Sequence, residues 1–239
     1  MRYFYSDRIS SAELILAESE RKHLVKTLRK RVGDSVNVLD GKGSVYQCEV
    51  KEIHKDYVLG LILGESKHSR PLWSLHLAIA PTKNLSKMEW MTEKCTELGV
   101  DKITFLHCQR SERAKVNIGR LKRIAVSAMK QSGRFFLPQI ENSVPYPSFV
   151  NNSLPVFRYI AHCADGEKAP LQDVAKDENV VILIGPEGDF TKEELVLAKK
   201  ANFKELSLGN TRLRTETAGI HVTSVINFIN QNKYASIPD

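Results

Sequence analysis

The first 64 residues alternate apolar and polar positions over short stretches, which is the pattern of β-strands that are buried on one face. Strands are predicted over residues 35–40, 44–53 and 57–63, and the glycines on either side of Lys42 indicate a hairpin between the first two. A helix is predicted over 20–30. Several short strands with little helix predict a small β-barrel.

After Pro71 the hydrophobic period changes, and strands alternate with amphipathic helices. Strands are predicted over 73–80, 102–106, 155–161, 180–184 and 205–208. Helices are predicted over 86–98, 117–131 and 191–201, with a last helix near the C-terminus, whereas 145–155 is expected to be loop. This alternation predicts an α/β fold with a mostly parallel sheet and helices on both faces. The polar stretch 67–71 ends in proline, so two domains are expected, 1–68 and 72–239.

Local signals place the ends of three helices. Ser86 and Glu89 have the spacing of a capping box, and Gly99 is the expected stop of that helix. Thr191 and Glu194 predict a second capping box. The helix over 117–131 is expected to turn four basic side chains toward solvent or a partner, namely Arg120, Lys122, Arg123 and Lys130.

Two glycine-bearing loops follow predicted strands late in the chain. Gly185-Pro186-Glu187-Gly188 comes directly after the apolar strand 180–184, and residues 208–218 follow the strand 205–208. Glycine permits positive φ and a close approach of the backbone to a ligand. Adjacent loops of this kind at the carboxyl edge of an α/β sheet predict a small-molecule cleft. The alternative is that both are ordinary βα turns.

The net charge of +7 is concentrated in one segment. Residues 108–136 contain eight Lys and Arg against one acidic residue, Glu112. A concentrated basic segment favours a polyanion, with nucleic acid as the leading candidate. The alternative is a solvated helix face.

Other motifs exclude several classes of protein. The sequence has no phosphate-binding P-loop, no dinucleotide fingerprint, no nucleophile elbow and no zinc-protease motif, so no metal is expected. The four cysteines are far apart, without zinc spacing, and are expected to be reduced and structural. No apolar stretch is long enough for a bilayer and no signal peptide is evident, so a cytoplasmic soluble protein is expected.

Several motifs together resemble the RsmE family of 16S ribosomal RNA uridine N3-methyltransferases, of the SPOUT class. The resemblance runs nearly the full length of the chain and is carried by residues 23–29, 96–100, 131–134, 185–188, 208–209 and 213–218. It implies an N-terminal PUA-like RNA-binding barrel over 1–68, and a SPOUT methyltransferase domain with a C-terminal trefoil knot over 72–239. It also implies a homodimer that acts on ribosomal RNA in the small subunit.

The resemblance implies S-adenosylmethionine as cofactor, held largely by main-chain groups of three loops. The cofactor-binding residues that it implies are Ala161, His162, Ile184, Gly185, Pro186, Glu187, Gly188, Leu206, Ser207, Leu208, Gly209, Arg212, Leu213 and Thr215. One departure is Asp189, where the family usually has glycine. Aspartate tolerates positive φ better than most residues, so we expect altered loop geometry with binding retained.

Methylation of uridine N3 requires removal of an imide proton and stabilisation of charge on the neighbouring carbonyl oxygens. We hypothesise that Arg214 or Arg134 donates hydrogen bonds to a uracil oxygen. Glu187 or Glu216 would accept or relay the proton. Two structural alternatives stay open: Glu216 favours the positive end of the last helix, and Glu187 caps backbone amides in its own loop.

RNA contacts are expected from both predicted domains, because a base inside structured RNA must be splayed out while the backbone is held. The candidates are Arg2, His23, Lys26, Arg29, Arg31, Arg110, Arg120 and Arg123.

Two other functions compete with the uridine N3-methyltransferase. A ribose 2′-O-methyltransferase of the same fold would share the cofactor loops but would need no imide deprotonation. A non-catalytic RNA-binding protein would keep the fold without turnover, although the glycines in both loops count against it.

Overall fold

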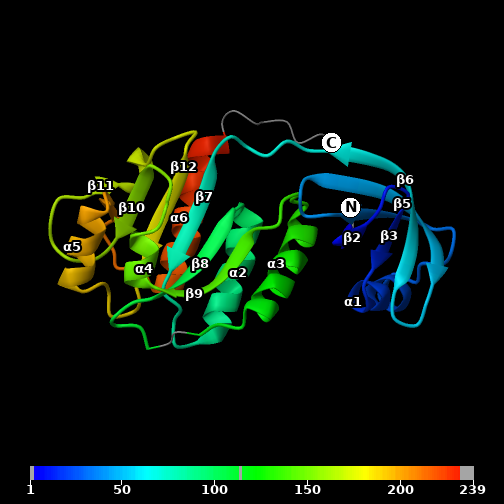
Figure 1. Cartoon of the computed structure of the whole chain (residues 1–239), viewed down its shortest axis with the longest axis horizontal. Helices are drawn as coiled ribbons and strands as arrows, with labels where there is room; N and C mark the ends of the chain where they lie inside the picture. The colour runs from blue at the N-terminus through cyan, green and yellow to red at the C-terminus, as the bar shows by residue number, and fades with distance from the viewer. Residues whose placement is uncertain (1–2, 113–114, 232–239) are drawn as a thin grey trace. The chain divides into compact units, whose positions relative to one another are not determined.

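The computed structural model describes residues 3–112 and 115–231, so the predicted RNA contact Arg2 and the basic residue Arg113 lie outside the described residues. The chain divides into two compact units (Figure 1). The first comprises the chain up to Arg70 together with 126–137, and the second comprises 71–125 and the chain from Pro138 onward. The first unit therefore includes a later segment that the predicted boundary near residue 70 does not anticipate.

The first unit is built on a curled six-stranded sheet in the order β1-β4-β5-β6-β3-β2. Its strands are β1 (Tyr3–Tyr5), β2 (Arg8–Ile9), β3 (Glu13–Leu16), β4 (Ser35–Leu39), β5 (Ser44–Ile53) and β6 (Val58–Lys67). Their inward side chains, Phe4, Leu14, Leu16 and Val38 among them, form a buried core with Leu24. The small barrel predicted from the sequence is thus an open, curled sheet.

The predicted hairpin is confirmed, because β4 and β5 pair antiparallel around residues 41–43. The helix predicted over 20–30 is shorter and less regular. It consists of α1 (Glu18–Lys22) and one π-helical turn, His23–Thr27. Arg29 has φ of 53°, in the left-handed region, and this conformation prevents the helix from continuing.

The second unit contains a seven-stranded sheet in which every pairing is parallel, in the order β11-β13-β10-β12-β7-β8-β9. Its strands are β7 (Ser74–Ile79), β8 (Lys102–His107), β9 (Gln139–Pro145), β10 (Phe157–Ala161), β11 (Ala169–Pro170), β12 (Asn179–Ile184) and β13 (Lys204–Ser207). The predicted parallel sheet is confirmed. The sequence pattern missed the edge strands β9 and β11.

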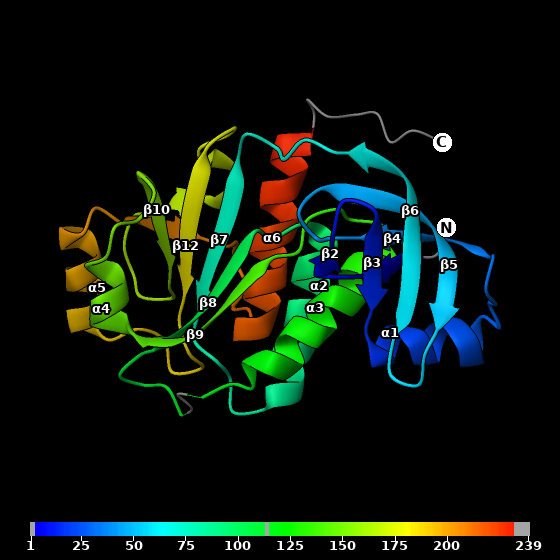
Figure 2. The same cartoon turned by 45° about the vertical axis from the view of Figure 1, so that its right-hand side comes forward.

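Helices cover both faces of this sheet (Figure 2). Leu77 and Ile79 of β7 face α2 (Leu85–Leu98) and α6 (Thr215–Gln231). A Cβ at Gly219 of α6 would lie 3.1 Å from both Ile79 and Met91, so α6 packs very close to the sheet. On the opposite face, Ala78 packs with α4 (Tyr146–Val150) and α5 (Lys192–Lys200). The short helix Leu171–Asp173 follows β11.

Three local expectations are corrected. The N-cap of α2 is Asn84, whose side chain accepts a hydrogen bond from the Ser86 N–H, so the predicted Ser86/Glu89 capping box does not form. The predicted loop over 145–155 contains α4, because Pro147 is compatible with the first helical turn and the aromatic side chains of α4 are buried. The capping box of Thr191 and Glu194 and the stop at Gly99, with φ of 92°, are confirmed.

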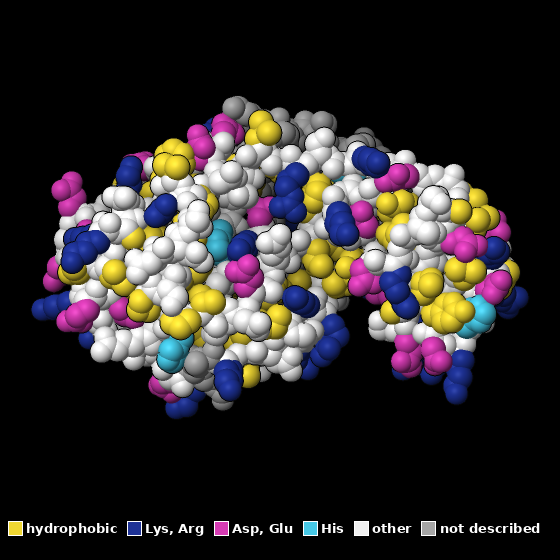
Figure 3. Space-filling view, viewed as in Figure 1, with side chains coloured by type: hydrophobic (Ala, Val, Ile, Leu, Met, Phe, Trp, Pro, Cys, Tyr) yellow, Lys and Arg dark blue, Asp and Glu magenta, His cyan; other side chains and the backbone are white. Residues whose placement is uncertain are grey.

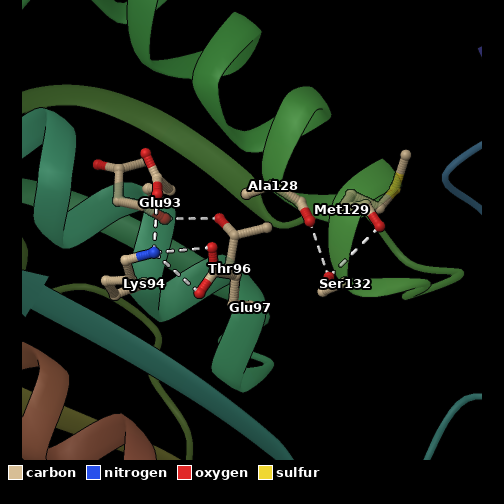
Figure 4. A network of polar contacts seen from close by, with 8 residues as sticks. Glu93, Lys94, Thr96, Glu97, Ala128, Met129 and Ser132 are labelled. Atoms are coloured by element: carbon tan, nitrogen blue, oxygen red, sulfur yellow. Dashed lines mark hydrogen bonds and ion pairs between the residues drawn. The ribbon is translucent and has the colours of Figure 1, made fainter.

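The helix α3 (Ile118–Ser132) contributes its first half to the second unit and its second half to the first. Lys130 was expected to face solvent or a partner, but its ammonium pairs with the buried Glu20 carboxylate in the first unit. Figure 4 shows how Ser132 donates to the Ala128 carbonyl, 2.8 Å away, in the last turn of α3. Among the described helices, none is long and apolar enough to cross a membrane.

His76 of β7 is buried within the sheet layer of the second unit. Its Nε2 lies 2.8 Å from Thr104 Oγ1, and its ring packs edge-on against Phe149. Burial, with a smaller contribution from Lys102, lowers the pKa of His76 from 6.5 to about 4. His76 is therefore neutral in the folded protein at neutral pH.

We predict that acidification destabilises the fold through His76. The unfolded chain binds a proton below about pH 6.5, whereas the folded chain resists it down to about pH 4, so the free energy of unfolding should fall over this interval by up to about 3 kcal/mol. Urea unfolding from pH 7 to pH 4 measures the slope. In His76→Gln the slope should be shallower, and equal slopes in both proteins would contradict the assignment.

Candidate functional site

Three strands of the second unit end at the same level of the sheet. Ala161, the last residue of β10, is paired with Ile184 at the end of β12 on one side and with Leu206 of β13 on the other. Because the strands are parallel, the loops that follow them leave the sheet at one edge. The two glycine-bearing loops predicted to form a cleft are thus adjacent.

These loops surround a cavity of about 670 Å³, a size typical of small-molecule sites. Of the residues predicted to bind the cofactor, all except Gly188 and Leu206 line it. Leu206 is fully buried in the sheet, and Gly188 lies against the Arg110 side chain. The cavity is also lined by Lys87 of α2, Cys163, Lys168, Asp189, Asn210, Thr211, Arg214, Glu216 and Ala218.

The loop after β12 is held in place through its carbonyl groups. The Thr215 hydroxyl donates to the Gly185 carbonyl at 3.1 Å, and Arg110 Nη1 donates to the Gly188 carbonyl at 2.9 Å. Arg212 Nη2 lies 3.3 Å from the Glu187 carbonyl. Each of these donors comes from another loop or from the start of α6, so the cavity wall is braced from several elements.

Asp189 adds a further brace to the same loop. Its φ is 63°, which is the left-handed conformation that aspartate tolerates better than most residues. One carboxylate oxygen accepts the backbone N–H of Cys163 at 2.8 Å, and the other accepts that of Phe190 at 2.9 Å. The side chain that replaces the usual glycine therefore joins the loop after β12 to the loop after β10.

His162 forms part of the wall after β10 and is buried. Its Nε2 lies 3.0 Å from Glu205 Oε1, and Glu205 also pairs with Lys199 at 2.9 Å. Burial first, and then Lys168, lower the pKa of His162, although Glu205 opposes the shift. At neutral pH the imidazole is therefore neutral. Its Nδ1 has no hydrogen-bond partner among the described residues.

The two carboxylates suggested for proton transfer lie in different surroundings. Glu187 is exposed, and its Oε1 accepts the backbone N–H of Lys83 at 3.2 Å. It thus caps a backbone amide in the loop before α2, whereas the sequence suggested its own loop. Glu216 is buried in the first turn of α6, and its Oε1 lies 2.9 Å from Lys87 Nζ. Lys87 was not identified from the sequence.

The two arginines suggested for uracil recognition lie in different units. Arg214 lines the cavity in the segment just before α6. Arg134 follows α3 and belongs to the first unit. Only Arg214 of this pair is therefore a cavity residue.

The candidate RNA contacts are also divided between the units. In the first unit Lys26, Arg29 and Arg31 are exposed, while His23 is half-buried beside Phe4.

In the second unit Arg123 is exposed, but two candidates already have protein partners. Arg110 braces the Gly188 carbonyl, and Arg120 forms a two-pronged ion pair with Glu89, with 2.8 Å between Nη2 and Oε2. Figure 3 shows charged side chains of both signs scattered over the visible face of this unit.

Cysteine environments bear on the expectation that all four are structural. Cys48, Cys95 and Cys108 are buried and unpaired. Burial raises the pKa of the Cys48 and Cys95 thiols to about 12, so both are protonated and unreactive. Cys163 differs, because it is exposed and lines the cavity.

Comparison with known proteins supports an RNA-modifying role. Residues 68–227 match the family model of an RNA methyltransferase domain, and residues 16–63 match that of an RNA methyltransferase PUA domain. The chain belongs to the RNA methyltransferase family. The resemblance to the RsmE family noted from the sequence is confirmed, as is the nature of the protein as a methyltransferase.

Individual members of the family match over nearly their whole length. Ribosomal RNA small subunit methyltransferase E of Rickettsia conorii is 29% identical over 91% of this chain and 91% of its own. A probable rRNA-methyltransferase from Porphyromonas gingivalis is 34% identical, with a TM-score of 0.89 over 96% of this chain and 98% of its own. Ribosomal RNA small subunit methyltransferase E from Neisseria gonorrhoeae, crystallised with S-adenosylmethionine, is 25% identical, with a TM-score of 0.84 over 96% and 98%.

The cavity of this methyltransferase fits S-adenosylmethionine. Gly209 has φ of 118°, and a Cβ there would meet no protein atom within 4 Å, so its backbone faces open space at the cavity. Main-chain groups from three loops line a volume that suits a nucleoside-sized molecule.

We predict that Asp189→Ala destabilises the protein by about 1–3 kcal/mol. Alanine is strained at positive φ, and the backbone N–H groups of Cys163 and Phe190 lose their acceptor. Urea unfolding measures the loss. Asp189→Asn is the matched control, since asparagine tolerates the conformation and keeps one oxygen acceptor, and it should lose less. An equal loss in both variants would contradict this role.

Proposed function

We propose that this protein transfers a methyl group from S-adenosylmethionine to N3 of a uridine in the RNA of the small ribosomal subunit. The observation that carries the proposal is the cavity where β10, β12 and β13 end together, bounded by both glycine-bearing loops. The family match supports methyl transfer to RNA, and relatives named for the small subunit support the substrate.

The cofactor supplies an already activated methyl group on a cationic sulfur, so the protein's task is to position and prepare the acceptor. Residues of the three loops would hold the cofactor, with main-chain groups from 184–187 and 207–213 beside it. Those loops also place charged side chains at the cavity. No metal is required for this chemistry.

The acceptor nitrogen must lose a proton, and Glu187 is our candidate to accept it. Glu187 is exposed at the cavity, and the Lys83 N–H that binds Oε1 fixes its carboxylate. Glu216 is buried and paired with Lys87, so it is less accessible to a substrate proton. Arg214 at the cavity is our candidate donor to a uracil oxygen as negative charge develops.

The finer architecture is also proposed. We assign RNA binding to the PUA-like region over 1–68 and methyl transfer to 72–239, a SPOUT-class domain with a C-terminal trefoil knot. The match of residues 16–63 to an RNA methyltransferase PUA domain supports the first assignment. We further propose that the protein is a homodimer, in which Arg134 of either copy could reach RNA. We place it in the cytoplasm, where its ribosomal substrate would be found.

We predict that the purified protein, incubated with labelled S-adenosylmethionine and small ribosomal subunits lacking the modification, forms 3-methyluridine, detected by mass spectrometry of nucleosides. Arg214→Ala should lower kcat about 10²-fold, because one donor to the developing anion is lost. Arg134→Ala, assayed in parallel, tests the second arginine. Lys200→Ala, exposed on α5, is the control and should keep full activity.

Other products would replace the proposal. A methylated ribose would identify a 2′-O-methyltransferase, and unlabelled RNA with intact folding would identify a binding protein. Full activity in both arginine variants would remove the arginine hypothesis while leaving the reaction in place.

A further inference from the structure

Lys87 lies near the start of α2, on an element that the sequence did not connect with the cofactor loops. Its Nζ is 2.9 Å from Glu216 Oε1. Within the described part of the chain, this is the only ion pair of which both members line the cavity. The pair therefore belongs to the site and needs a role there.

The carboxylate of this pair is the fixed partner. The Glu216 side chain is 7% exposed, whereas that of Lys87 is 34% exposed. Glu216 lies in the first turn of α6, where the positive end of the helix favours a negative charge. A flexible lysine is thus anchored by a buried carboxylate. Its ammonium has three N–H donors, and Glu216 Oε1 takes one, which leaves donors for a ligand in the cavity.

Two of the other basic side chains at the cavity are engaged with the backbone. Lys168 Nζ donates to the Ala164 carbonyl within its own loop. Arg212 Nη2 donates to the Glu187 carbonyl and braces the loop after β12. These two contacts indicate that Lys168 and Arg212 stabilise the loops. Lys87 contacts a side chain only, so its position is explained less well by bracing of a loop.

The chemistry of the substrate calls for a second donor. Uracil N3 lies between two carbonyl groups, and the negative charge that develops on deprotonation spreads over both oxygens. Under the proposed function, Arg214 would donate a hydrogen bond to one of these oxygens. We propose that Lys87 is a further catalytic residue, which donates to the other uracil oxygen, and that Glu216 is the positioning residue that holds the Lys87 ammonium in place. This inference rests on the proposed function.

The step is balanced without another reactant. The N3–H bond breaks and its proton passes to the Glu187 carboxylate. The N3 electron pair forms the new N–CH₃ bond as the methyl–sulfur bond breaks, and that electron pair stays on sulfur. Lys87 keeps its protons throughout and acts only through its positive charge and hydrogen bond.

The test is to compare Lys87→Met with wild type on two RNAs, one with uridine and one with 5-fluorouridine at the target. The fluorine makes N3–H more acidic, so less stabilisation of the anion is needed. On uridine RNA we expect kcat at saturating cofactor to fall about 10²-fold, the usual effect of losing one such donor. On 5-fluorouridine RNA the loss should shrink to about tenfold or less.

Three further variants sharpen the comparison. Lys87→Arg keeps the charge and should recover part of kcat, whereas Glu216→Gln should reproduce part of the Lys87→Met defect. Lys94→Met is the matched control, the same substitution on the same helix at a lysine paired with Glu93 and Glu97 (Figure 4), and should be unaffected.

Two outcomes would overturn the inference. Equal fold losses on both RNAs would mean that Lys87 does not stabilise the anion. A weaker affinity for S-adenosylmethionine in calorimetry, with unchanged kcat at saturation, would assign Lys87 to cofactor binding. Failure of the proposed function is distinct, because then wild type itself makes no 3-methyluridine.

Discussion

The parallel pairing of β10 with both β12 and β13 is the constraint on which the site depends. Ala161 is in register with Ile184 and with Leu206, so three chain segments that are far apart in sequence end side by side. A parallel sheet places the loops after its strands at one edge. A shift of one residue in either pairing would turn the loop residues to the opposite face of the sheet.

The site combines this rigid base with loops whose main-chain groups are hydrogen-bonded by side chains of neighbouring loops. Arg110 and Asp189 each bond main-chain groups of a neighbouring loop. Such contacts leave the inner surface of the loops free for a ligand. The exception is the ion pair of Lys87 and Glu216, which places charge at the cavity from two helices rather than from a loop.

Much of this arrangement follows from sequence pattern. The apolar strand predicted over 180–184 and the capping box at Thr191 have local causes that act within a few residues, and both appear as expected. Among the loop glycines, Gly209 has a positive φ, whereas Gly185 and Gly188 do not. The resemblance to a known family added the third wall at Ala161 and His162, which has no local signal of comparable strength.

The remaining features depend on tertiary contacts, and the sequence could not predict them. The period of α2 shows which side of the helix is apolar, but it does not show that the Lys87 ammonium meets Glu216. The helical period predicted that Lys130 faces solvent or a partner, whereas the fold places Glu20 beside its ammonium. Helix α4 was not predicted, because the prolines of this segment favour a loop, but burial of Tyr146 and Phe149 stabilises the helix.

The most direct test of the account is a crystal structure of the protein with S-adenosylmethionine. We predict that the cofactor lies in the cavity, against the main chain of residues 184–187 and 207–213, with its methyl group toward the open side. Density for the cofactor at any other place, or crystals that contain an empty cavity at saturating cofactor, would contradict it.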